Sequence, residues 1–180
     1  MEPQISDKYA VPSAIGQGTN NYTVSQLNRY VATVANRGTV YKLTLLDKTT
    51  DSNGKIIKNY EPVVINTMDD VSSGTWDLVQ SGMIAMINNS PTFNGLGISM
   101  AGKTGTAQQS EIHPDHALFV GYAPAESPEI AIAVRIANGY SSSYTSEVAR
   151  DIIRARYHLA DTSELITGSA ANLGTAIHGD

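Results

Sequence analysis

Two apolar stretches joined by a short proline-bounded link constrain the fold more than any other part of the sequence. The first runs from His116 to Ala123 and the second from Glu129 to Ala137, and Pro124 to Pro128 connect them. So short a connection joins antiparallel neighbours, because a parallel pair needs a much longer crossover. Residues 130–134 are all apolar, which is typical of a strand that is covered on both faces. We therefore predict an antiparallel hairpin with a buried second strand.

Three segments with helical periodicity surround this hairpin. Thr23 and Gln26 have the spacing of a capping box and begin a helix that ends at Gly38. Ser73 is the expected cap of a second helix, and Ser143 opens a third. The apolar positions expected on the buried stripes are Val24, Leu27, Val31 and Val34, then Trp76, Val79, Met83, Met86 and Ile87, and last Val148, Ile152, Ala155 and Leu159.

The remaining segments complete an α+β fold. Residues 39–46 are rich in β-branched and aromatic side chains and precede a turn at 51–54, which predicts a peripheral β excursion. A strand over Ser99 to Gln109 makes the hairpin a three-stranded antiparallel meander, which three main helices cover. We expect an extended segment over 1–20, one folded unit over 21–160 and a flexible tail over 161–180.

Charge and composition exclude several classes of function. The chain has 17 acidic and 12 basic residues, and no cluster of Lys and Arg gives it a nucleic-acid footprint. It has no cysteine, which excludes disulfides and a thiolate nucleophile. No apolar run approaches the roughly 20 residues that span a bilayer, and no export signal follows Met1.

One motif fits two patterns. From Gly97 the residues match the phosphate-binding P-loop pattern G-x-x-x-x-G-K-[ST], but no buried strand precedes them and no amphipathic helix follows. From Lys103 the same residues spell Lys-Thr-Gly-Thr on an extended segment. A strand at the edge of a cleft can offer the lysine ammonium and the hydroxyls of Thr104 and Thr106 to a carboxylate. The backbone N–H of Thr106 can serve as an oxyanion donor.

A series of short phrases resembles one enzyme family. The phrases are Ile15-Gly-Gln-Gly18, Thr23-Val-Ser-Gln-Leu27, Ala35-Asn-Arg-Gly38, Gly82-Met83, Ala101-Gly-Lys-Thr-Gly-Thr-Ala-Gln108 and Phe119-Val-Gly-Tyr-Ala-Pro124. In this order they resemble the C-terminal part of the transpeptidase domain of class B penicillin-binding proteins, the peptidoglycan D,D-transpeptidases. The resemblance implies a partial serine β-lactamase/transpeptidase-like fold.

The resemblance also implies a site and a reaction. Lys103, Thr104, Gly105 and Thr106 would bind the terminal carboxylate of a D-Ala-D-Ala stem peptide or of a β-lactam, and the Thr106 N–H would be an oxyanion donor. Stem peptides would be cross-linked through an acyl-serine intermediate without a cofactor. The full-length protein would act in cell-wall synthesis and cell shape at the outer face of the bacterial cytoplasmic membrane, with its anchor outside this chain.

In the family, the S-x-x-K nucleophile motif and the S-x-N motif precede Ile15. No S-x-N occurs here, and Ser6, Ser25 and Ser90 have no lysine three residues later. We therefore expect the chain to lack both motifs, to begin at a fragment start and to be inactive alone. A strand edge at 129–137 and the apolar helix faces would then need covering by self-association or by the missing N-terminal half.

Alternatives remain at this stage. The chain could be a fragment of a β-lactamase or β-lactam sensor, or a non-catalytic interaction and scaffold module with the same fold. His113 and His116 have H-x-x-H spacing, but Pro114 disfavours a helix between them, and we expect loop histidines and no metal site. Residues 138–143 either line the mouth of the cleft or form a simple loop.

Overall fold

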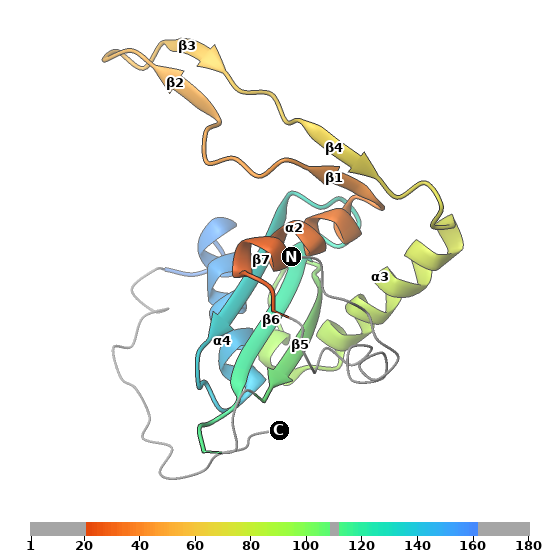
Figure 1. Cartoon of the computed structure of the whole chain (residues 1–180). Coiled ribbons are helices and arrows are strands. Elements are labelled where there is room, and N and C mark those ends of the chain that lie inside the picture. Colours follow the sequence, from red (N-terminus) through yellow and green to blue (C-terminus); the bar gives the residue numbers. More distant parts are fainter. Residues whose placement is uncertain (1–20, 109–111, 162–180) are drawn as a thin grey trace.

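The computed structural model describes residues 21–108 and 112–161 (Figure 1). Its elements are α2 (Val24–Ala35), β1 (Thr39–Tyr41), β2 (Lys48–Thr50), β3 (Ile56–Asn59), β4 (Val64–Thr67), α3 (Ser73–Asn88), the 3-10 helix η1 (Pro91–Phe93), β5 (Ala101–Ala107), β6 (His116–Ala123), β7 (Ile130–Ile136) and α4 (Ser142–Arg156). This order matches the predicted one: helix, β excursion, helix, three-stranded meander, helix.

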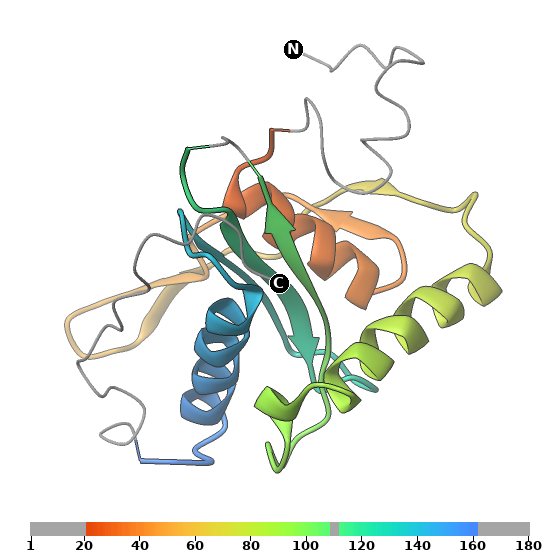
Figure 2. The ribbon, with the colours of Figure 1, turned by 90° about the horizontal axis from the view of Figure 1, so that it is seen from below.

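The centre of the molecule is the antiparallel sheet β5-β6-β7. The predicted antiparallel hairpin is present, and its register pairs Ala123 with Ile130, while Gly102 of β5 pairs with Gly121. Helix α2 covers one face of the sheet and α4 covers the other (Figure 2). The last strand is therefore covered on both faces, as its apolar sequence predicts.

The two faces of the sheet differ in side-chain size. On the α4 face, Ile130, Ile132 and Val134 of β7 join a cluster around the fully buried Phe119. On the α2 face, β7 contributes the small Ala131 to the second cluster. Alternation of large and small residues along β7 lets α2 lie close to the sheet while bulky side chains fill the space under α4.

Helix starts agree with the capping signals to within one residue. The Thr23 hydroxyl accepts the Gln26 N–H at 3.2 Å, and the Gln26 side chain accepts the Thr23 N–H at 2.8 Å, which completes the predicted capping box. The second helix begins at Ser73, but the capping side chain is that of Ser72, which accepts the Thr75 N–H. Apolar side chains expected on the buried stripes are exposed at Val24 in α2 and Val79 in α3.

The buried stripe of α4 is not the predicted one. Val148 and Ile152 are 41% and 40% exposed, so their placement in the core was wrong. The buried face consists of Ser142, Thr145, Ser146, Ala149 and Ile153. The Thr145 hydroxyl donates to the Ser142 carbonyl at 2.8 Å, so its polar group is satisfied inside the protein. Small hydroxyl residues can therefore occupy the close contact with the sheet.

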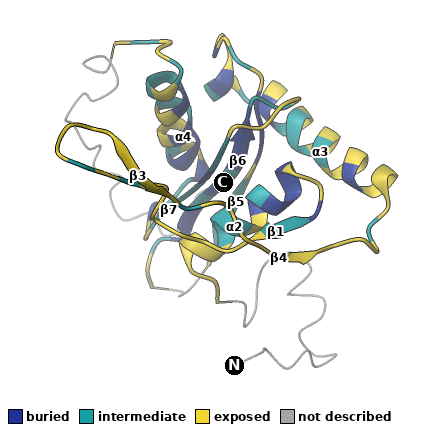
Figure 3. Ribbon diagram, turned by 90° about the horizontal axis from the view of Figure 1, so that it is seen from above, coloured by how far each residue is buried: buried dark blue, intermediate teal, exposed yellow. Residues whose placement is uncertain are grey.

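The β excursion forms an arm that projects from the rest of the molecule (Figure 1). Strand β1 pairs with β4 and β2 pairs with β3, both antiparallel. The β pattern predicted over 39–46 yields a shorter strand, which ends at Tyr41, and one further backbone bond joins the Lys42 N–H to the Val63 carbonyl at 2.8 Å. Much of the arm is exposed, including the apolar side chains of Leu45 and Ile57 (Figure 3).

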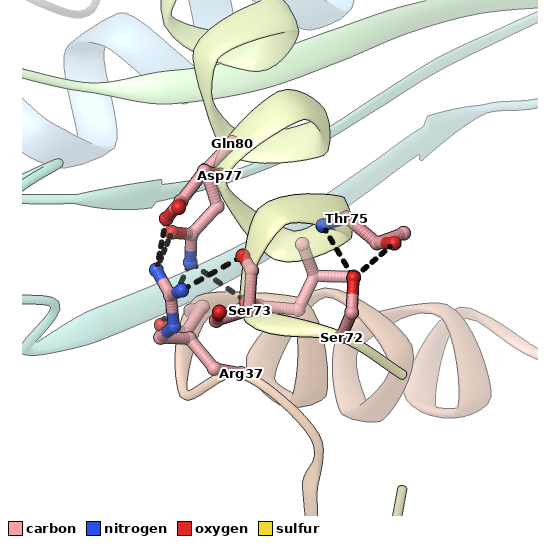
Figure 4. A network of polar contacts seen from close by, with 8 residues as sticks. Arg37, Ser72, Ser73, Thr75, Asp77 and Gln80 are labelled. Atoms are coloured by element: carbon pink, nitrogen blue, oxygen red, sulfur yellow. Dashed lines mark hydrogen bonds and ion pairs between the residues drawn. The ribbon is translucent and has the colours of Figure 1, made fainter. Parts of the chain in front are cut away.

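Arg37 joins the two helices at the base of this arm (Figure 4). Its guanidinium lies 2.8 Å from the Asp77 carboxylate and donates to Gln80 Oε1 at 3.2 Å and to the Ser73 carbonyl at 3.0 Å. Gln80 in turn donates to the Val34 carbonyl at 2.9 Å. The end of α2 and the start of α3 are thus held together while the arm leaves between them.

Several expectations fall partly outside the described residues. The segment 1–20, which contains the Ile15 to Gly18 phrase, lies there, as does the predicted tail beyond Asp161. Within the described residues, β7 has a strand neighbour on one side only, which agrees with an open edge there. Among the described helices, none is long and apolar enough to cross a bilayer.

Candidate functional site

The Lys-Thr-Gly-Thr motif lies on β5, at one edge of the three-stranded sheet. Helix α3 packs against the start of this strand, where a Cβ added to Gly102 would lie 3.1 Å from Ile87 Cδ1. From Lys103 onward the strand is exposed or half-buried, in contrast to the buried Ala101 and Gly102. The motif therefore occupies the accessible part of an edge strand.

Two contacts show which backbone N–H and C=O groups of β5 face β6 and which face the other edge of the strand. A Cβ at Gly121 would lie 2.7 Å from the Ala101 carbonyl oxygen, so this oxygen faces β6. The Lys103 ammonium donates to the Thr104 carbonyl at 2.9 Å. Directions alternate along an antiparallel strand, so the backbone groups of Thr104 and Thr106 face away from β6, toward the edge of β5 that has no strand neighbour among the described residues. The Thr106 N–H is thus free of the β5-β6 ladder.

The three polar side chains reach this edge from different faces of the strand. Thr104 pairs with Phe119 and Thr106 pairs with Ala117, so both hydroxyls lie on the α4 face of the sheet. Lys103 belongs to the opposite face by alternation, and its bond to the Thr104 carbonyl brings the ammonium to the strand edge. A cation and an outward N–H thereby lie at the edge of β5, and two hydroxyls lie on the α4 face of the same strand, a donor set suited to an anion.

A strained turn lies at the Thr106 end of the sheet. After β7 the chain passes through Asn138 and Tyr140, which have φ angles of 53° and 69°, a region that non-glycine residues rarely adopt. The Asn138 N–H donates to His116 Nδ1 at 2.9 Å, and a Cβ at Gly139 would lie 3.0 Å from Ala117 Cβ. Because Ala117 is the pairing partner of Thr106, this turn lies near the motif. Sequence analysis named residues 138–143 but missed the contact with His116.

The two histidines of the H-x-x-H pattern differ in environment. His113 is exposed, whereas His116 is 8% exposed. Burial lowers the pKa of His116 from its ordinary value of 6.5, Arg135 lowers it further, and Asp115 raises it. Among the described residues, no three His, Cys, Asp or Glu side chains are grouped as metal ligands would be.

The P-loop alternative is wrong. Gly97 lies in a loop, and Gly102, Lys103 and Thr104 lie inside a strand, whereas a P-loop places its Lys and Thr at the start of a helix. There is accordingly no helix N-terminus at this motif to hold phosphates.

One serine does have lysine at the nucleophile spacing, contrary to our expectation that none does. Ser52-Asn-Gly-Lys55 matches S-x-x-K as a pattern. It lies in the β2-β3 turn, where the Asp51 carboxylate accepts the N–H groups of Asn53 and Lys55. This hairpin is the far end of the arm, away from β5 (Figure 1). Ser52 and the Lys103 motif are therefore not parts of one site in this structure.

Comparison with known proteins identifies the family. The sequence profile described as "Penicillin binding protein transpeptidase domain" matches residues 3–155. The chain belongs to this family. Penicillin-binding protein 2A of Bacillus subtilis is 32% identical over 81% of the chain and 23% of its own length. Peptidoglycan D,D-transpeptidase MrdA of Acinetobacter baumannii is 33% identical over 77% of the chain and 23% of its own length.

The fold agrees with this assignment. A structure of penicillin-binding protein A from M. tuberculosis, an imipenem acyl-enzyme complex, superposes with a TM-score of 0.70 at 25% identity. The superposition covers 81% of this chain and 33% of the other protein chain. The chain thus spans about a quarter of the length of the curated relatives it matches and a third of this structural neighbour. The class B resemblance and the transpeptidase-like fold are confirmed.

Proposed function

We propose that this chain supplies the carboxylate-binding strand of a peptidoglycan D,D-transpeptidase domain. Lys103, Thr104 and Thr106 hold the terminal carboxylate of a D-Ala-D-Ala stem peptide or of a β-lactam, and Gly105 leaves room for the ligand to approach the strand. The Thr106 N–H stabilises the oxyanion that forms when the penultimate D-Ala carbonyl is attacked. The observation that carries the proposal is the presence of an ammonium, two hydroxyls and an outward N–H together on the edge strand β5.

Charge and geometry explain why this strand would select a carboxylate. An ammonium and two hydroxyls together give charge-assisted hydrogen bonds, which are about twice as strong as neutral ones. Lys103 is exposed and its nearest polar contact is a backbone carbonyl, so a ligand carboxylate would exchange a weak partner for an ionic one. Gly105 is not overpacked, since an added Cβ would lie 3.6 Å from Leu118 Cβ, which is ordinary van der Waals contact.

The acylated serine would come from another part of a longer polypeptide. The proposed reaction transfers the acyl group to serine with loss of D-Ala, and an amine of a neighbouring stem peptide then releases it. Ser52 lies in an exposed hairpin turn, remote from β5. We therefore infer that this chain alone binds the carboxylate but forms no acyl-enzyme.

The proposed partners and location follow from membership of the same family. The full-length protein would act on peptidoglycan and in cell shape at the outer face of the cytoplasmic membrane, held by an anchor outside this chain. Strand β7 has an open edge within the described residues, and Val148 and Ile152 of α4 are exposed. Exposed strand edges and apolar patches favour association, so we propose that self-association or pairing with the N-terminal half of the domain covers them.

A matched pair of lysine variants tests the binding role. Lys103 and Lys48 are both exposed lysines on strands, but Lys48 lies on the arm. We expect K103A to weaken binding of N-acetyl-D-Ala-D-Ala about tenfold, the value of one charge-assisted hydrogen bond, and K48A to leave it unchanged. Equal affinities of the two variants would exclude the β5 site.

Labelling with a fluorescent penicillin tests the inference that this chain alone forms no acyl-enzyme. We expect no covalent adduct on this chain, and adding S52A should change nothing. An adduct on the wild-type chain that S52A removes would show that Ser52 is a nucleophile after all and would refute the inference that the acylated serine lies elsewhere.

A further inference from the structure

We propose that His116 is a positioning residue, whose neutral imidazole holds the turn 138–140 beside Thr106 by accepting the Asn138 N–H. The distance from Nδ1 to the Asn138 nitrogen is 2.9 Å. His116 is the first residue of β6, and Asn138 follows the end of β7, the strand that pairs with β6. The inference rests on the proposed function, because it concerns the wall of the same site.

The hydrogen bond fixes the protonation state of the ring. A backbone N–H can only donate, so Nδ1 must be the unprotonated nitrogen and the proton must be on Nε2. Burial of the ring also disfavours the charged form. A protonated His116 would carry a hydrogen on Nδ1 facing the Asn138 N–H, and the two donors would repel each other. The Asn138 end of the turn therefore keeps this hydrogen bond only while the imidazole is neutral.

The turn needs such a partner because its backbone conformation is unfavourable. Asn138 and Tyr140 both have positive φ angles, which the surrounding structure must impose on non-glycine residues. Two hydrogen bonds from the lead-in to β6 do this: His116 accepts the Asn138 N–H, and the Asp115 carbonyl accepts the Tyr140 N–H at 3.0 Å. The start of β6 therefore holds both ends of the turn.

The turn contacts the sheet next to the proposed site. A Cβ at Gly139 would lie 2.8 Å from Ile136 Cβ and 3.0 Å from Ala117 Cβ, so the turn backbone touches the sheet at the Ala117 row. In that row Ala117 pairs with Thr106, and in the next row His116 pairs with Ala107. Loosening the turn would uncover the face of the sheet on which the Thr106 hydroxyl lies.

The charged surroundings of His116 leave the neutral form favoured. Arg135 on β7 lowers its pKa, and Asp115 beside it raises it, with burial as the largest effect. The strand opposite contributes Ala107, which carries no charge. The position of the turn should thus change as the pH falls through the pKa of His116, which folding lowers below the ordinary 6.5.

Nuclear magnetic resonance of the full chain tests this without ligand. We expect the ¹⁵N shifts of His116 to report the Nε2–H tautomer, and a scalar coupling through the hydrogen bond between Nδ1 and the Asn138 nitrogen. Acidification should abolish the coupling and move the Thr106 amide signal with the same midpoint. Absence of the coupling at neutral pH, or a Thr106 signal that ignores His116 titration, would overturn the proposal.

Variants extend the test to binding. Asn places an acceptor oxygen near the position of Nδ1, whereas Phe keeps the ring and removes the acceptor. We expect H116F to weaken N-acetyl-D-Ala-D-Ala binding about fivefold, the value of one neutral hydrogen bond. We expect H116N to restore the binding and to remove its dependence on pH below 6.5. Binding equal to wild type in H116F would refute the positioning role. If the wild-type chain binds no ligand, the proposed function fails, and the coupling and the Thr106 signal still decide the role of His116.

Discussion

The structure predicts opposite effects on stability when one methyl group is added at Gly102 or at Gly105 of the same strand. A Cβ at Gly102 would lie 2.6 Å from Phe119 Cζ, 3.0 Å from Phe119 Cε2 and 3.1 Å from Ile87 Cδ1. A Cβ at Gly105 would have Leu118 Cβ at 3.6 Å as its nearest neighbour, which is ordinary van der Waals contact. Neither glycine has a positive φ angle, so G102A and G105A differ mainly in packing.

The magnitude follows from how little Phe119 can move. Its side chain is fully buried, and its ring lies 5.6 Å from the ring of Phe93, centroid to centroid. Overpacking a well-filled core costs about 1–3 kcal/mol, and the contact below 3 Å indicates the upper half of that range for G102A. G105A should change the free energy of unfolding by less than about 1 kcal/mol, and in the stabilising direction if lower entropy of the unfolded chain dominates.

Urea unfolding followed by circular dichroism measures this difference. We expect G102A to lower the midpoint urea concentration without changing the slope, and G105A to keep or raise the midpoint. G105A should nevertheless weaken ligand binding, because its methyl group occupies the proposed approach to the strand. A G102A protein as stable as G105A would refute the packing of β5 against Phe119 that places the motif.

Three further predictions concern helix packing, the base of the arm and pH. I153A should destabilise the protein by about 2–5 kcal/mol in urea unfolding, because Ile153 is fully buried; I152A should cost under about 1 kcal/mol, and equal losses would contradict the described face of α4. R37A should lower stability by about 1 kcal/mol through loss of the exposed Asp77 pair and its hydrogen bonds, and R37G should cost less because glycine accepts the φ of 62°. Since folding lowers the pKa of His116, the unfolded chain binds more protons than the folded chain below pH 6.5. The contribution of neutral His116 to the free energy of unfolding is therefore complete above pH 6.5 and is lost as the pH falls through the lowered pKa. In urea unfolding at several pH values, H116N should remove this part of the pH dependence of stability.

Local signals predicted the sheet and the helix starts well. The link from Pro124 to Pro128 is too short for anything but an antiparallel connection, so the orientation of β6 and β7 followed from chain length alone. The Thr23 and Gln26 side chains satisfy each other's backbone, which makes the start of α2 a property of four consecutive residues. Such features depend on no distant contact.

Features set by tertiary contacts were predicted less well. The buried face of α4 carries Thr145 and Ser146, because their hydroxyls find the Ser142 carbonyl, and periodicity of apolar residues cannot reveal that. The contact between His116 and Asn138 joins residues 22 positions apart and has no sequence signature. Ser52 and Lys55 fit a nucleophile pattern in the turn predicted at 51–54, but the separation of this turn from β5 is visible only in the structure (Figure 1).

The central claim is that β5 binds a carboxylate, and a pair of ligands that differ only in that group tests it most directly. N-acetyl-D-Ala-D-Ala and its C-terminal amide should be titrated into the ¹⁵N-labelled chain while the amide signals of Thr104 and Thr106 are followed. The acid should shift both signals with a saturable curve that K103A flattens, and the amide should leave them in place. Equal shifts with acid and amide, or an acid response that survives K103A unchanged, would contradict the account.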